Sequence, residues 1–190
     1  MNWLAHLYLS EPEVEFRVGN LLPDWLRPWE TVGLPEGFQR GIERHRAIDA
    51  FTDAHPLVRR SVRRFEKPFR RYGGVLTDVF YDHFLAKGWN VHSKEPLGEF
   101  VHGFYDSVPQ VQEHIPAEAC AVLEHMRAGD WLCSYATLEG IETTLRRMSR
   151  RLRFPFDLAA SVAVLEAQYE GFQEDFEGFF PEVIAHVKEG

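Results

Sequence analysis

Apolar residues recur every three to four positions along most of this chain, which is the spacing of one face of an α-helix. The first apolar run, WLAHLY, predicts a short helix over residues 2–10. A second short helix is expected from Pro12 to about Gly19, and residues 26–35, with two prolines and a glycine, are expected to form a loop. Longer periodic segments predict helices over residues 36–54, 57–72, 77–88, 97–107, 117–128, 136–152 and 157–180.

Proline and glycine mark the ends of these segments. His55 precedes Pro56, and the residue before a proline avoids the α region, so the helix over residues 36–54 should stop there. Gly73 is expected to end the helix over 57–72, and Pro181 to separate the last helix from a short tail. No segment alternates between apolar and polar residues as a strand does, and no repeat is present. We therefore expect an all-α, single-domain helical bundle.

Composition narrows the class of protein. A chain of 190 residues with 45% hydrophobic residues and 15 Phe is most simply one domain, residues 1–190, with a substantial core. The formal net charge of −8 argues against general nucleic-acid binding. No apolar run reaches the ~18 residues of a membrane span, and the first residues lack the basic region and cleavage site of a signal peptide. Two cysteines are too few for a disulfide scaffold, so we expect a cytoplasmic protein without membrane contacts.

Candidate chemistry gathers in two of the predicted helices. His45, Asp49 and Asp53 stand at positions i, i+4 and i+8, which form one stripe on a helix. Asp78, Asp82 and His83 lie in the next-but-one helix, and both sets are surrounded by apolar residues. A carboxylate in such surroundings is costly to bury unless a cation or a hydrogen-bond donor receives it. The two sets are therefore candidates for sharing one cation.

His6 and Asp24 complete the list of possible ligands. Mixed imidazole and carboxylate ligands suit Mn²⁺, Fe²⁺, Mg²⁺ or Zn²⁺, and helical bundles build such sites from facing helices. Each residue also has a simpler explanation. His6 can be a packed histidine, Asp24 follows a proline as turn-forming residues do, and Asp49 can pair with Arg46 on a solvated face. The chain has no GxSxG, P-loop or GxGxxG motif, so serine-hydrolase, NTPase and dinucleotide-binding functions have no support.

Two segments are strongly basic although the chain is acidic. Residues 57–71 contain seven Lys or Arg with Glu66 as the only acid, and residues 143–153 contain five Arg and no acid. Local pairing cannot neutralise these charges, so they predict a surface for an acidic partner. The alternative is a solvated face paired with acids elsewhere in the fold.

Four ordered blocks resemble the acyl carrier protein phosphodiesterase family. They are MNWLAHLYLS at residues 1–10, GNLLPDW at 19–25, GIERHRAIDAFTDAHP at 41–56 and DVFYDHFLAKGW at 78–89. The resemblance implies an all-α fold related to the HD superfamily of metal-dependent phosphohydrolases. It also implies hydrolysis of the phosphodiester that joins 4′-phosphopantetheine to a serine of holo acyl carrier protein. The implied cofactor is a divalent metal, usually Mn²⁺, with Mg²⁺ or Fe²⁺ as alternatives.

The resemblance further implies roles for individual residues. Metal ligands would be Asp24, His45, Asp49, Asp78 and Asp82. Arg46 would stabilise the phosphoryl oxygens, and His83 or His6 would protonate the leaving serine oxygen. The acidic carrier protein would dock on Arg59, Arg60, Arg63, Arg64 and Lys67.

The chain also departs from the wider HD superfamily. No adjacent His-Asp pair precedes the site, and the inverted pair Asp82-His83 stands in its place. Two other functions stay open from the sequence alone. One is a phosphohydrolase of the same fold acting on a small nucleotide or phosphate ester, and the other is a non-enzymatic helical module that binds an acidic protein.

Overall fold

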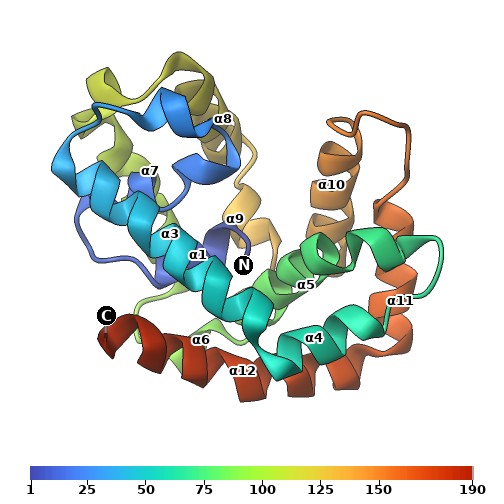
Figure 1. Ribbon diagram of the computed structural model, residues 1–190. Coiled ribbons are helices and arrows are strands. Elements are labelled where there is room, and N and C mark those ends of the chain that lie inside the picture. Colours follow the sequence, from blue (N-terminus) through green and yellow to red (C-terminus); the bar gives the residue numbers. More distant parts are fainter. Residues whose placement is uncertain (190) are drawn as a thin grey trace.

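The computed structural model describes residues 1–189, and all of its regular elements are helical (Figure 1). Its α-helices are α1 (Trp3–Tyr8), α2 (Val14–Gly19), α3 (Glu36–Ala54), α4 (Pro56–Arg63), α5 (Gly73–Lys87), α6 (Trp89–His92), α7 (Leu97–Ser107), α8 (Ala117–Ala128), α9 (Trp131–Ser134), α10 (Leu138–Ser149), α11 (Val162–Ala167) and α12 (Tyr169–Glu189). Short 3₁₀ turns connect them: η1 (Leu22–Asp24), η2 (Pro28–Thr31), η3 (Phe69–Tyr72), η4 (Val108–Gln110), η5 (Gln112–His114) and η6 (Ala159–Ser161). The predicted all-α fold is confirmed.

The helix predicted over residues 57–72 is wrong in its second half, because α4 ends at Arg63. Lys67 precedes Pro68, and a residue before proline avoids the helical conformation. Gly73 begins α5 instead of ending the preceding helix. A Cβ on Gly73 would lie 3.1 Å from a methyl carbon of Val62, so the lack of a side chain lets the start of α5 pack against α4.

The predicted C-terminal helix is also wrong at both ends. It is divided into η6, α11 and α12, and α12 continues through Pro181 to Glu189. A proline inside a helix costs ~3 kcal/mol because it removes a backbone hydrogen bond. The apolar face of α12 nevertheless continues past it, since Phe180 and Val183 are both fully buried. Core packing on both sides of Pro181 therefore outweighs the local cost.

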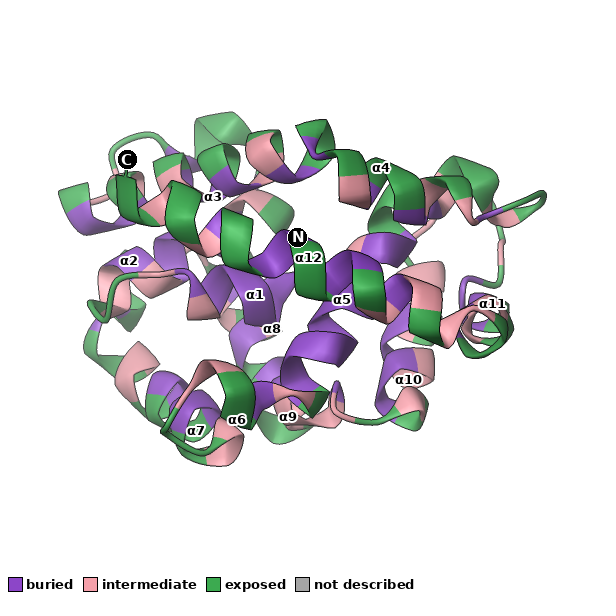
Figure 2. Ribbon diagram, turned by 90° about the horizontal axis from the view of Figure 1, so that it is seen from below, coloured by how far each residue is buried: buried purple, intermediate pink, exposed green. Residues whose placement is uncertain are grey.

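Helix α5 forms the centre of the core. Its residues Phe80, Tyr81 and Leu85 are fully buried, and α1, α4, α10 and α12 pack around it. Figure 2 shows α5 and α1 in the interior, while the surrounding helices expose one face each to solvent. The N-terminus lies between the part of the molecule that contains α3, α7 and α8 and the part that contains α10 (Figure 1). This arrangement brings α1 against both α3 and α5, which carry the predicted site residues.

Among the residues that the structure describes, no helix combines the length and the apolar character that crossing a membrane requires.

Candidate active site

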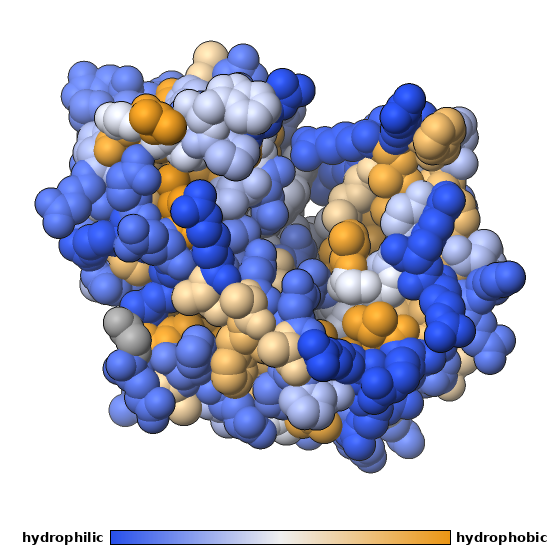
Figure 3. All heavy atoms as spheres, viewed as in Figure 1, coloured by the Kyte–Doolittle hydropathy of each residue, from blue (hydrophilic) through white to orange (hydrophobic). Residues whose placement is uncertain are grey.

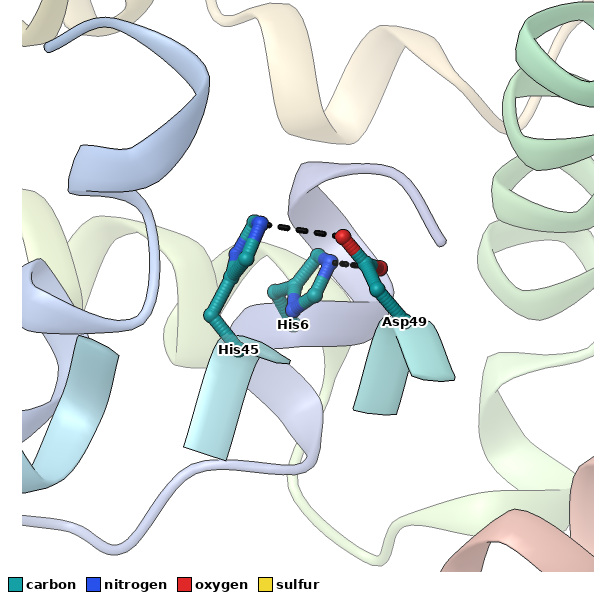
Figure 4. Close-up of side chains that lie close together, drawn as sticks. All are labelled: His6, His45 and Asp49. Carbon is teal, nitrogen blue, oxygen red and sulfur yellow. Dashed lines mark ion pairs between the residues drawn. The ribbon is translucent and has the colours of Figure 1, made fainter. Parts of the chain in front are cut away.

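Two histidines and one aspartate meet where α1 approaches α3. His45 and Asp49 are one helical turn apart on α3, so their side chains lie on the same face. His6 comes from α1, and its ring stacks on that of His45 with 4.1 Å between the ring centroids. The two carboxylate oxygens of Asp49 face the two rings, at 3.2 Å from His6 Nε2 and 3.1 Å from His45 Nε2 (Figure 4).

Asn20, at the end of α2, contacts the Nδ1 atoms of both histidine rings. Its side-chain oxygen lies 3.1 Å from His6 Nδ1, and its backbone carbonyl lies 2.8 Å from His45 Nδ1. The orientation of the Asn20 amide is fixed, because its nitrogen donates to the His6 carbonyl and to the Ser10 hydroxyl, each at 2.8 Å. Asn20, which is fully buried, therefore links the two rings through two different oxygen atoms.

These contacts determine which ring nitrogens carry hydrogen. An oxygen of an amide or carbonyl accepts hydrogen bonds, so Nδ1 of His6 and Nδ1 of His45 must both be donors. In the neutral ring, Nε2 then carries a lone pair, and both Nε2 atoms face the oxygens of Asp49. His6 Nε2 is buried and makes no hydrogen bond of acceptable geometry within the described residues. Lone pairs facing one another at these distances require a proton or a cation between them.

The local charges shift the pKa values of the three groups in different directions. Burial lowers the pKa of His6 below its ordinary value. Burial also acts to lower the pKa of His45, but the hydrogen bond with Asp49 and the charges of Asp24 and Asp49 outweigh it and raise that pKa. Burial acts to raise the pKa of Asp49, and the two histidines with the nearby Met1 ammonium hold it well below its usual range instead. Asp49 is therefore a carboxylate surrounded by positive and hydrogen-bonding groups.

Asp24 and Asp78 border this cluster on opposite sides. Asp24, in η1, accepts a hydrogen bond from the Trp3 indole at 2.9 Å through Oδ2, and its Oδ1 lies 3.9 Å from His45 Nε2. The Met1 ammonium lies between Asp49 and Asp78, at 3.1 Å from Asp49 Oδ1 and 3.3 Å from Asp78 Oδ1. Asp49 and Asp78 therefore share one cation, the Met1 ammonium.

Burial and the charge of the neighbouring group act in opposite directions on the pKa values of Asp78 and of the Met1 amine. Burial raises the pKa of Asp78 to about 6, although the Met1 ammonium opposes this shift. Burial acts to lower the pKa of the Met1 amine, but the charges of Asp78 and Asp49 outweigh it and raise that pKa to about 10. The ammonium therefore stays charged at neutral pH.

The structure places Asp82 and His83 apart from this cluster. Both oxygens of Asp82 accept backbone N–H groups at the start of α1, from Leu4 at 2.8 Å and Ala5 at 2.9 Å. Burial raises the pKa of Asp82 to about 7 even though these two hydrogen bonds oppose it. Both ring nitrogens of His83 are also engaged, by the Tyr135 carbonyl and the Tyr169 hydroxyl, each at 2.8 Å. Asp82 and His83 hold helices together in this fold.

Arg46 is exposed on α3, one residue after His45. Among the described residues, no hydrogen bond or ion pair joins it to the histidines or aspartates of the cluster.

The basic residues of α4 and its C-terminal extension divide into two groups. Arg60 and Arg64 both bind the carboxylate of Asp175 on α12. The side chain of Asp175 is completely buried. Arg59, Arg63 and Lys67 are exposed. The helix that was predicted to present one continuous basic surface therefore uses two of its arginines to bind α12, although the Arg60 side chain stays 49% exposed.

Two hollows meet at Asp78. The first, called here the apolar cleft, has a volume of about 320 Å³ and lies between α1, α5 and α10. Its apolar wall consists of Trp3, Val75, Val79, Met148, Leu152 and Leu158, and Asp24, Asp78 and Arg151 also line it. The surface is visibly hollowed beside α10, with apolar side chains along the α10 side (Figure 3).

The second hollow, called here the basic hollow, has a volume of about 360 Å³. It is lined by Asp78, Asp53 and Gly74 together with Arg59 and Arg63 of α4. The two hollows therefore share Asp78 in their linings. They differ in their cationic side chains, since Arg59 and Arg63 line the basic hollow beside its two aspartates and Arg151 lines the apolar cleft.

A second group of possible metal ligands lies at α9 and α7. His102, Asp130 and Cys133 have ligand atoms within 4.8 Å of one another. His102 is exposed, and burial together with Asp130 raises the pKa of the Cys133 thiol to about 12. A protonated thiol is a poor metal ligand. The cluster at His6 is therefore the better candidate for a metal site.

The sequence interpretation missed Asn20 and Trp3. Asn20 was considered only as the end of a helix, and Trp3 only as an apolar residue of α1. The one signal for Asn20 was its position four residues before Asp24 in the block GNLLPDW.

The comparisons with known proteins agree with the blocks seen in the sequence. The family described as acyl carrier protein phosphodiesterase matches residues 1–183. The acyl carrier protein phosphodiesterase of Enterobacter sp. strain 638 is 32% identical over 189 residues, which cover 99% of this chain and 98% of that protein. Those of Escherichia coli strains HS and Crooks are 32% identical over 188 residues, or 98% of this chain and 97% of theirs. No solved structure matches the chain. The chain belongs to the acyl carrier protein phosphodiesterase family.

Proposed function

We propose that this protein hydrolyses the phosphodiester between 4′-phosphopantetheine and a serine of holo acyl carrier protein. The products are apo acyl carrier protein and free 4′-phosphopantetheine. The observation that carries this proposal is the convergence of His6, His45 and Asp49 beside Asp24 and Asp78, two carboxylates that line the apolar cleft. Family membership supports the substrate, because the relatives are named for acyl carrier protein.

A divalent ion fits the residues at this point. Nε2 of His6 and Nε2 of His45 lie 3.2 Å and 3.1 Å from the two oxygens of Asp49, and two atoms bound ~2.1 Å from one ion lie at most ~4.2 Å apart. His6 Nε2 is buried without a hydrogen bond, and Asn20 keeps both Nε2 lone pairs turned toward Asp49. Imidazole with carboxylate suits Mn²⁺ or Fe²⁺, and we propose Mn²⁺, with Mg²⁺ as an alternative. When bound, the ion would lower the pKa of a water and neutralise charge on the phosphoryl oxygens.

The chain's own side chains would position the reactants. Trp3 holds Asp24 by Oδ2, which leaves Oδ1 toward His45 and the apolar cleft. We assign Asp24 Oδ1 as the atom that accepts the proton of the attacking water. The oxygen of that water forms a bond to phosphorus, the bond from phosphorus to the serine oxygen breaks, and the serine oxygen takes a proton from solvent water. Asp24 then releases the proton that it accepted to solvent, which restores its carboxylate.

Charge on the phosphoryl group needs an arginine at the site. Arg151 lines the apolar cleft together with Asp24 and Asp78, whereas Arg46 lines neither hollow. We therefore assign the contact with the phosphoryl oxygens to Arg151 instead of Arg46. His83 has no free ring nitrogen, so we assign it no proton transfer.

The carrier protein would dock on the exposed basic residues. Arg59 and Arg63 line the basic hollow, which reaches Asp78, and Lys67 is exposed beyond α4. Acyl carrier proteins are acidic, so these charges would raise the association rate over a screening length of ~8 Å at physiological salt. Arg60 and Arg64 both bind Asp175, whose one negative charge offsets one of their two positive charges, so they contribute less to such a surface.

The direct test is mass spectrometry of holo acyl carrier protein after incubation with the protein and Mn²⁺. We expect the carrier protein to lose the mass of 4′-phosphopantetheine. The variant Asp49→Asn is the matched inactive control, since it changes one charge and keeps the shape of the side chain. An unchanged carrier mass with the wild-type protein, after metal content has been verified, would overturn the proposed substrate.

A double variant that reverses both charges, Arg59→Glu with Arg63→Glu, tests the docking surface. We expect KM for the carrier protein to rise and to lose its dependence on salt, with a smaller change in kcat. Hydrolysis of a small phosphodiester should stay near the wild-type rate. An unchanged KM and salt dependence would show that the carrier protein docks elsewhere.

A further inference from the structure

A phosphodiester has two substituents, and two hollows meet at this site. In the proposed reaction one substituent is a protein and the other is the uncharged pantetheine arm. Asp78 lies in the wall of both hollows, so a phosphoryl group held beside it is next to each of them. The hollows differ in the side chains that they offer the two substituents, because two exposed arginines line one and a wall of valine, leucine, methionine and tryptophan side chains lines the other.

We infer that the apolar cleft between α1, α5 and α10 is the binding site for the pantetheine arm. This inference rests on the proposed function and assigns each side of the diester to one hollow. The acidic protein lies over Arg59 and Arg63, and the arm runs along Val75, Val79 and Leu152.

The chemistry of the arm fits the walls of the cleft. Pantetheine contains a geminal dimethyl group and methylene segments, separated by two amides that need hydrogen-bond partners. The cleft offers apolar contacts from Val79, Met148 and Leu152, and polar groups from Tyr72 and Arg151. Its volume of about 320 Å³ is within the ~300–1,000 Å³ range of small-molecule sites. The basic hollow is a poorer fit for the arm, since the arm has no charge to pair with Arg59 and Arg63.

A substitution that fills the cleft tests this assignment. Val75 lines the cleft on α5 and is 43% exposed, so Val75→Trp adds a large side chain without disturbing the core. Val91 on α6 is 81% exposed and lines neither hollow, so Val91→Trp is the matched control. Three substrates separate the contributions. They are holo acyl carrier protein, a short serine peptide carrying the phosphopantetheine arm, and methyl 4-nitrophenyl phosphate, which has a methyl group in place of the arm.

We expect Val75→Trp to raise KM about tenfold for both substrates that carry the arm, because a tryptophan in the cleft replaces the apolar contacts of the arm. The arm-less diester should be affected much less, and Val91→Trp should leave all three substrates unchanged. Equal behaviour of the two variants would overturn the inference. So would an effect of Val75→Trp on the carrier protein but not on the peptide, because the cleft would then contact the protein and not the arm.

A binding measurement separates this inference from the proposed function. Free 4′-phosphopantetheine is titrated into the wild-type and the two variants, and tryptophan fluorescence is followed, since Trp3 lines the cleft. Binding that Val75→Trp weakens about tenfold and Val91→Trp leaves intact supports the inference even if the protein fails to hydrolyse holo acyl carrier protein. Hydrolysis of the carrier protein by the wild-type, together with binding that Val75→Trp leaves unchanged, overturns the inference alone.

Discussion

Arg63 and Arg64 are neighbours in sequence with opposite expected roles, so substituting each by methionine gives a matched pair of variants. Methionine keeps an unbranched chain of similar length and removes the charge. Arg63 is exposed and lines the basic hollow. Arg64 is mostly covered and binds Asp175 on α12, whose side chain is completely buried.

The loss of folding stability in Arg64→Met follows from the contacts that the buried carboxylate of Asp175 loses. Arg64 Nε donates to Asp175 Oδ2 at 3.1 Å, and Arg64 also donates to the Gly171 carbonyl at 3.0 Å. Removing one partner of a buried ion pair costs ~3–5 kcal/mol. Asp175 keeps Arg60 and the Ser61 hydroxyl, which donates at 2.8 Å, so we expect a smaller loss of ~2–3 kcal/mol. For a chain of this size each kcal/mol lowers Tm by ~2–4 °C, which predicts a fall of ~4–12 °C.

Thermal unfolding of the two variants beside the wild-type measures this difference. Arg64→Met should unfold ~4–12 °C earlier, while Arg63→Met should stay within the ~0.5 kcal/mol of an ordinary surface substitution. In the hydrolysis assay the order should reverse, with the higher KM for the carrier protein in Arg63→Met. A fall in Tm of equal size in both variants would refute the division of α4 into an internal and an external basic face.

Three further predictions concern the cluster. Chelation should abolish hydrolysis of the carrier protein and added Mn²⁺ should restore it, equally in the wild-type and in Cys133→Ser; full activity of protein shown by elemental analysis to be metal-free would contradict a metal role. Asn20→Ala should weaken Mn²⁺ binding ~10–100-fold by calorimetry, and Asp49→Asn should weaken it further, because the first loses the support of one histidine and the second loses a charged ligand. Trp3→Phe should lower kcat about tenfold, measured at a temperature where the variant stays folded, because it removes the hydrogen bond that orients Asp24; an unchanged kcat would count against Asp24 as the proton acceptor.

The part of the site that lies within one helix could be predicted from the sequence. His45 and Asp49 are four residues apart, and once α3 is helical their side chains must lie on one face. His6 and Asp24 are different, because their approach to α3 depends on contacts between segments far apart in the chain. Both residues entered the list of possible ligands by residue type alone, and periodicity gave no reason to place them beside α3.

The same limit explains why Asp82 was grouped with the metal ligands. A carboxylate among apolar residues needs either a cation or hydrogen-bond donors, and the local sequence does not distinguish the two. The donors turned out to be backbone N–H groups of α1, 77 and 78 residues away. Likewise, Arg60 and Arg59 look alike in the sequence, and only the position of Asp175 on α12 separates them.

The hydrogen bonds of Asp82 also set the order in which this site can form. Helix α1 has six residues, too few to be stable alone in water. Its first N–H groups are received by Asp82, so α1 with His6 is held only after α5 has folded and docked. A site that depends on such a distant contact is absent from the unfolded chain. An ion that needs His6 therefore binds after folding, and its binding free energy adds to the stability of the whole domain.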